Sequence, residues 1–151
     1  MRNKLTVILG AALLLVLIFI WGNSILSPEV SGKISGFVGD VMADVLGEGD
    51  SSTTVGGLPV RKLGHFFEYL VLGAVVLLFL TSFMKNTALR FSILVSAGLA
   101  VPLIDETIQI FSGRGPSLTD VWIDVAGYSL GCVLAYFAVI IAKNTVLKSK
   151  K

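Results

Sequence analysis

The chain has 151 residues, of which 54% are hydrophobic and only 15% are charged, and its mean hydropathy is +0.87. Soluble domains are about 45–50% apolar and about 25% charged, so this composition excludes an ordinary soluble domain and indicates a membrane protein. The net charge of +2, without a basic patch that contains aromatic residues, argues against nucleic acid as a partner.

Four apolar stretches predict an all-α integral membrane bundle, formed by a single domain over residues 1–151. A helix needs roughly 17–25 residues to cross the hydrocarbon. The predicted spans cover about residues 5–25, 63–83, 90–111 and 120–142. Because no clear small-x-small cleavage site follows the first span, we expect it to be an uncleaved anchor rather than a signal peptide.

The segment between the first and second spans has two parts. Apolar residues recur at helical spacing over about residues 29–47, which predicts an amphipathic helix on the outer membrane surface or across the end of the bundle. A disordered loop is the alternative, because the glycines in this stretch weaken a helix. Residues 47–58, rich in Gly, Ser and Thr, have the composition of a flexible linker.

Basic residues predict the orientation, because Lys and Arg are enriched in cytoplasmic loops. Eight of the twelve basic residues lie at the amino end, between spans two and three, or in the carboxyl-terminal tail. All ten acidic residues lie in the opposite loops or at the opposite ends of the spans. We therefore expect a multi-pass protein with both termini in the cytoplasm and its acidic end facing outside.

The second span carries ionisable residues near its start, where they are costly in lipid. Lys62, His65 and Tyr69 share one helical face, and Glu68 lies beside His65. Polar groups within membrane segments are a functional-site hypothesis by default.

The third and fourth spans carry matching polar stripes at the same predicted depth. In the third, Asp105 and Gln109 are four residues apart, and Glu106 flanks them. In the fourth, Asp120 and Asp124 are four apart, and glycines continue this stripe, which would let a neighbouring helix approach closely. The Gly- and Pro-rich turn between these spans contains Arg114 and would hold this residue over the end of the bundle. We expect the stripes to face one shared, outward-facing cavity.

The polar residues resemble the pattern of the VanZ-like family of bacterial membrane proteins. That pattern comprises Lys-x-x-His-Phe-x-x-Tyr, Asp-Glu-x-x-Gln-x-Phe, a Gly-Arg turn and Asp-x-x-x-Asn-x-x-Gly. The matching residues are, in order, Lys62, His65, Phe66, Tyr69, Asp105, Glu106, Gln109, Phe111, Gly113, Arg114, Asp120 and Gly127. Asp124 departs from the pattern, since Asn is frequent there, and makes the site more acidic.

The resemblance covers roughly residues 60–135. It implies a role in the bacterial cell envelope and a lowered susceptibility to teicoplanin-type lipoglycopeptides, but it supplies no reaction. Three hypotheses about function follow from the residues and the resemblance together.

The first hypothesis is a binding module for the head group of a membrane lipid, a lipid-linked cell-wall precursor or a lipoglycopeptide antibiotic. Arginine and lysine suit phosphate or carboxylate groups, and the carboxylates would orient these cations or accept hydrogen bonds from an amine or sugar. The candidate ligand-binding residues are Lys62, His65, Tyr69, Asp105, Glu106, Gln109, Arg114, Asp120 and Asp124.

The second hypothesis is an intramembrane hydrolase acting on a lipid-linked cell-wall precursor. His65 and Glu68 could form a base and its orienting group. Alternatively, a divalent cation could activate water while held by His65, Asp105, Glu106 and Asp120. The candidate catalytic residues are His65, Glu68, Asp105, Glu106 and Asp120. No serine or cysteine lies in a context typical of a nucleophile.

The third hypothesis is structural. The polar groups would satisfy one another and hold four short helices together, because buried charges are normally paired. Four short helices could also need a partner subunit, so an oligomer is possible.

Overall fold

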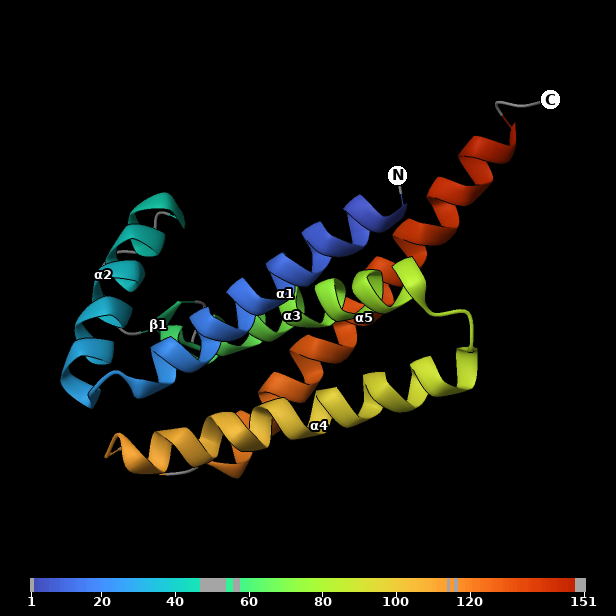
Figure 1. Cartoon of the computed structure of the whole chain (residues 1–151). Helices are drawn as coiled ribbons and strands as arrows, with labels where there is room; N and C mark the ends of the chain where they lie inside the picture. Colours follow the sequence, from blue (N-terminus) through green and yellow to red (C-terminus); the bar gives the residue numbers. More distant parts are fainter. Residues whose placement is uncertain (1, 47–53, 56–57, 114, 116, 149–151) are drawn as a thin grey trace.

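The computed structural model describes residues 2–46, 54–55, 58–113, 115 and 117–148. It is all-helical apart from one two-stranded ladder (Figure 1). The helices are α1 (Arg2–Ile25), α2 (Pro28–Leu46), α3 (Val60–Phe83), α4 (Thr87–Phe111) and α5 (Leu118–Lys148). Among the described residues, α1, α3, α4 and α5 are the helices long and apolar enough to cross a membrane. The predicted four-span fold is confirmed, and the protein is a multi-pass membrane protein.

The helix between the first two spans is also confirmed, since α2 occupies the predicted amphipathic segment. Its exposed apolar side chains include Val30, Ile34 and Phe37. Most of the predicted linker, residues 47–58, lies outside the described residues. At its end, β1 (Thr54–Val55) pairs antiparallel with β2 (Leu58–Pro59), and this short ladder leads directly into α3.

Polar caps fix the starts of two spans. The Asn86 side chain accepts a hydrogen bond from the backbone N–H of Leu89, 3.1 Å away, where α4 begins. Ser117 Oγ accepts one from the backbone N–H of Asp120, 3.2 Å away, at the start of α5. Such caps satisfy N–H groups that the first helical turn leaves without a partner, so they set where these helices start.

The closest helix contact joins α3 to α5 and depends on glycine. A Cβ placed on Gly127 or Gly131 of α5 would overlap the backbone of α3, at Phe66 and Leu70 respectively. A Cβ on Gly73 of α3 would overlap the backbone of α5. The predicted glycine stripe is therefore confirmed, and it lets two backbones meet without intervening side chains.

The apolar core lies where α1, α3 and α5 pack together. Its buried members are Ile20, Tyr69, Leu72, Val76, Leu80 and Tyr128. Elsewhere the spans expose large apolar side chains, among them Ile18, Phe91 and Phe137. Exposed apolar surface on this scale is costly in water, but it is the expected surface of a bundle that faces lipid.

The start of α1 and the end of α5 lie at the same end of the bundle (Figure 1). The four spans alternate in direction, so the end of α1, the start of α3, the end of α4 and the start of α5 meet at the opposite end. This topology gathers the polar stripes that are far apart in the sequence.

Candidate functional site

A group of polar side chains fills the end of the bundle opposite the termini. We call it the polar cluster. Its members are Asn23, Ser24, Arg61, Lys62, His65, Glu68, Asp105, Glu106, Gln109, Asp120 and Asp124. Seven of these are buried, and they come from all four spans: Ser24, His65, Asp105, Glu106, Gln109, Asp120 and Asp124. The structure therefore brings the predicted polar stripes together.

Asp105 occupies the centre of the cluster and is fully buried. Ser24 Oγ of α1 donates a hydrogen bond to its Oδ1. Gln109 Nε2, one turn later on α4, donates to its Oδ2 at 3.1 Å. These two donors orient the carboxylate. Asp105 and Gln109, which the sequence placed on one helical face, are therefore in direct contact.

His65 lies between two buried aspartates from different helices. Its Nδ1 is 3.4 Å from Asp124 Oδ1 and 3.9 Å from Asp105 Oδ2. These three residues can each offer a ligand atom, and those atoms lie within 4.8 Å of one another. Among the described residues, this is the histidine–carboxylate group compact enough to hold a metal ion. It differs from the set considered from the sequence, since Asp124 takes the place of Glu106 and Asp120.

Arg61 and Lys62 form the cationic edge of the cluster, and both are partly exposed. Arg61 Nη2 donates to Gln109 Oε1 at 2.8 Å and is 3.6 Å from Asp120 Oδ2. Lys62 Nζ is 4.0 Å from Asp120 Oδ1. Asp120 is thus the partner of the cations, a role that the sequence did not distinguish from that of Asp124.

Glu106 contacts the turn at the start of α5. Its Oε2 accepts a hydrogen bond of 2.7 Å from the backbone N–H of Ser117. This contact ties the end of α4 to the turn that starts α5. This hydrogen bond directly supports a structural role for Glu106 in joining α4 to α5.

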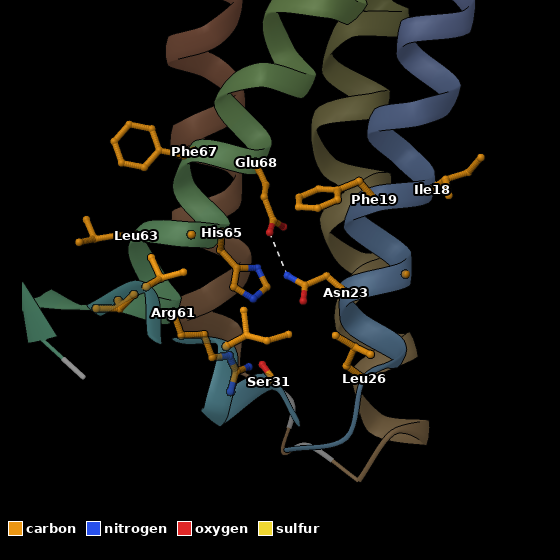
Figure 2. A pocket seen from close by; sticks show the side chains of 15 residues that line it. Ile18, Phe19, Asn23, Leu26, Ser31, Arg61, Leu63, His65, Phe67 and Glu68 are labelled. Atoms are coloured by element: carbon orange, nitrogen blue, oxygen red, sulfur yellow. Dashed lines mark hydrogen bonds between the residues drawn. The ribbon is translucent and has the colours of Figure 1, made fainter. Parts of the chain in front are cut away.

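Glu68 makes a contact that the sequence reasoning missed. Its Oε1 accepts a hydrogen bond of 2.9 Å from Asn23 Nδ2 of α1 (Figure 2). The sequence paired His65 with Glu68 as a base and its orienting group, whereas the ion-pair distances of His65 Nδ1 are to Asp105 and Asp124. The sequence signal for the α1 contribution was the polar Asn23–Ser24 pair that ends an otherwise apolar run.

Two further predicted residues have different outcomes. Tyr69 is fully buried in the core, and its hydroxyl has no hydrogen-bond partner among the described residues. Arg114 lies outside the described residues, so its predicted position over the bundle stays a prediction.

A groove of about 550 Å³ adjoins the cluster between α1, α2 and α3 (Figure 2). One side of the groove is polar, where His65, Glu68 and Arg61 of α3 face Asn23 of α1. The remaining walls are largely apolar and include Ile18, Phe19, Leu26, Ile34, Val38 and Phe67. A second apolar hollow of about 380 Å³ lies between α1 and α3 and shares Phe19, Phe67 and Glu68 with the groove.

The cluster carries an excess of negative charge. It contains five carboxylates, two permanent cations and one histidine. With every carboxylate ionised and a neutral imidazole, the excess is three negative charges. Charges buried in a low-dielectric environment are normally compensated by partners or metal ions, so the site is suited to a cation or a cationic group.

The fold and the site together define a multi-pass membrane protein with four spans. Its polar site lies at one end of the bundle, beside a groove. A family model described as VanZ/LLP1 matches residues 9–140, which is most of the chain. The chain therefore belongs to the VanZ/LLP1 family, as its motifs indicated. No curated protein and no solved structure matches it.

Proposed function

We propose that the protein binds an amphipathic molecule of the bacterial cell envelope. The lipid chain of this molecule lies in the groove between α1, α2 and α3, and its polar head contacts the polar cluster. The ligand is a lipid-linked cell-wall precursor or a lipoglycopeptide. Binding of the lipoglycopeptide lowers susceptibility to teicoplanin-type antibiotics.

The observation that carries this proposal is the continuity of an apolar groove with the polar cluster. Ligand sites have volumes of about 300–1,000 Å³, mostly apolar walls and a few converging polar groups. The groove has a volume of about 550 Å³, within this range. Its polar side presents Glu68, His65 and Arg61 at one place, and apolar side chains cover the rest. A molecule with a polar head and a lipid chain matches both parts.

The charge of the cluster favours a head group that carries an amine. Arg61 and Lys62 already lie beside Asp120, so one of their two positive charges is offset there, whereas the cluster as a whole is negative. Glu68 is only partly buried and lines the groove, where it can accept hydrogen bonds from an ammonium group. This revises the sequence-based emphasis on an anionic head group.

The distribution of basic residues supports a site on the outer side of the membrane. Lys4, Lys85 and Lys143 lie toward the end of the bundle that carries the termini, whereas the acidic cluster is at the other end. By the positive-inside rule, the termini are cytoplasmic, and the cluster is exposed to envelope components.

The structural hypothesis accounts for part of the cluster only. The bond from Ser117 to Glu106 joins helix ends and needs no ligand. Buried polar atoms of His65, Glu106 and Asp124 have no hydrogen-bond partner among the described residues, and a role in joining helices alone does not explain them.

Two glycines that line the groove allow a direct test. A Cβ on Gly22 or Gly64 meets no atom within 4 Å, so Gly22→Leu and Gly64→Leu add bulk to the groove without a clash at the Cβ. Gly32 of α2 also has open space around it and lies outside the groove lining, which makes Gly32→Leu the matched control. The purified protein in detergent micelles is titrated with teicoplanin, with deacylated teicoplanin, and with a polyprenyl-linked precursor.

We expect the wild type and Gly32→Leu to bind an acylated ligand equally. Each groove variant should bind it at least tenfold more weakly, a loss of about 1.4 kcal/mol. Comparison of teicoplanin with the precursor identifies the class of ligand, and deacylation should weaken the binding of teicoplanin. Equal affinities across all four proteins, or no loss on deacylation, would refute the groove as the lipid-chain site.

A further inference from the structure

We infer that His65, Asp105 and Asp124 form a binding site for a divalent transition-metal ion, such as Zn²⁺ or Mn²⁺, at the centre of the polar cluster. The three ligands come from α3, α4 and α5, so one bound ion would connect three of the four spans. This inference is independent of the amphipathic ligand proposed above.

The separations between the ligand atoms suit a metal ion. Zn²⁺ forms bonds of about 2.0–2.2 Å to imidazole nitrogen and carboxylate oxygen in a tetrahedral arrangement. In that geometry, neighbouring ligand atoms are about 3.4 Å apart. His65 Nδ1 is 3.4 Å from Asp124 Oδ1 and 3.9 Å from Asp105 Oδ2, and all three ligand atoms lie within 4.8 Å. Side-chain shifts of up to about 1 Å would bring this group to the metal-bound geometry.

Asp124 supplies a second and independent observation. It is completely buried, and neither of its carboxylate oxygens has a hydrogen-bond partner among the described residues. Its contact with His65 Nδ1, itself a buried atom without a hydrogen bond to a described residue, has the distance of an ion pair. Removal of a carboxylate from water costs several kcal/mol unless hydrogen bonds, a counter-ion or a metal compensates it.

The charge of the group fits a doubly charged ion. Two carboxylates and a neutral imidazole carry two negative charges, which a divalent cation neutralises. A protonated imidazole in place of the metal would leave one negative charge uncompensated within the group. The cations at the edge of the cluster contact Asp120.

The surrounding contacts resemble those around metal ligands. Metal-bound carboxylates are commonly held by hydrogen bonds from neighbouring groups, and Asp105 receives such bonds from Ser24 and Gln109. Mixed nitrogen and oxygen donors suit Zn²⁺, Mn²⁺ and Fe²⁺ better than Mg²⁺ or Ca²⁺, which prefer oxygen alone. Three protein ligands also leave a coordination position for water or a ligand group, and His65 lines the groove.

The test measures metal binding by the full-length protein in detergent micelles, without any groove ligand. Metal content is determined by mass spectrometry after purification and after loading with ZnCl₂ or MnCl₂, and the midpoint of thermal unfolding is measured with metal and with EDTA. The variants Asp124→Asn and His65→Gln keep side-chain size while removing a ligand atom. Glu29→Gln is the matched control, because it removes an exposed carboxylate of α2 that lies outside the polar cluster.

We expect the wild type and Glu29→Gln to bind one ion per chain, with a higher unfolding midpoint that EDTA reverses. Asp124→Asn and His65→Gln should bind at least tenfold more weakly. If these variants do not fold, the visible absorption of Co²⁺-loaded wild type decides, since four-coordinate nitrogen–oxygen ligation gives intense bands. A wild type that neither binds these ions nor responds to EDTA overturns the inference, and so does equal loss of binding in Glu29→Gln. These results do not depend on whether the groove accepts an amphipathic ligand.

Discussion

Replacement of Gly131 by alanine tests the contact that brings His65 and Asp124 together. The added Cβ would overlap the Leu70 carbonyl oxygen, and it would lie 2.8 Å from the Leu70 carbonyl carbon and 3.0 Å from the Ala74 backbone nitrogen. These are backbone atoms, which cannot rotate away as a side chain can. The helices α3 and α5 would therefore have to separate.

The expected cost follows from this geometry. Insertion of a methyl group into a packed interior destabilises a protein by about 1–3 kcal/mol, and rigid backbone neighbours place Gly131→Ala near the upper value. Alanine is favoured over glycine within a helix by about 1 kcal/mol, which lowers the net loss to about 2 kcal/mol. Gly22→Ala is the control, since open space surrounds its Cβ, and helix propensity alone should stabilise it.

Reversible unfolding in mixed micelles, followed by circular dichroism, measures both variants against the wild type. Gly131→Ala should unfold at a lower denaturant concentration, and Gly22→Ala at the same or a higher concentration. If Gly131→Ala is as stable as Gly22→Ala, then α3 and α5 do not approach as closely as described, and the distance between His65 and Asp124 is not fixed by glycine packing.

Two further predictions concern the buried hydrogen bonds and the orientation. Ser24→Ala removes a donor to the fully buried Asp105 and should destabilise the protein by about 1–3 kcal/mol, measured by the same unfolding assay. For the orientation, the native cysteine is first replaced by Cys132→Ala. In that background, an impermeant thiol reagent added to intact cells should label Leu118→Cys, at the exposed start of α5, but not Lys85→Cys in the turn between α3 and α4.

Each of these predictions has a control and a contrary result. Ser92→Ala removes an exposed hydroxyl that bonds within its own helix and should change stability by less than about 0.5 kcal/mol. Equal effects of Ser24→Ala and Ser92→Ala would contradict the importance of the bond to Asp105. Labelling of Lys85→Cys alone in intact cells would reverse the proposed orientation. Labelling of both positions after the membrane is permeabilised shows that each cysteine can react.

The sequence by itself determined the membrane class, the number of spans and the residues that share a helical face. Hydropathy sets the spans because the thickness of the bilayer requires a minimum length of apolar helix. The spacing of Asp105 and Gln109 along one helix predicts their contact, since residues four apart are neighbours in any α-helix. The glycine stripe of α5 and the family motifs were likewise readable, because both depend on local order along the chain.

Only the tertiary structure decided which polar group meets which. Asp120 and Asp124 lie on one face of α5, yet one contacts the edge cations and the other contacts His65. The difference depends on how deeply each residue lies against α3 and α4 and on the rotation of each helix about its axis. Spacing within a single helix carries no information on either quantity. The same holds for Ser24 and for the groove, since both exist only where α1 packs against helices that are distant in sequence.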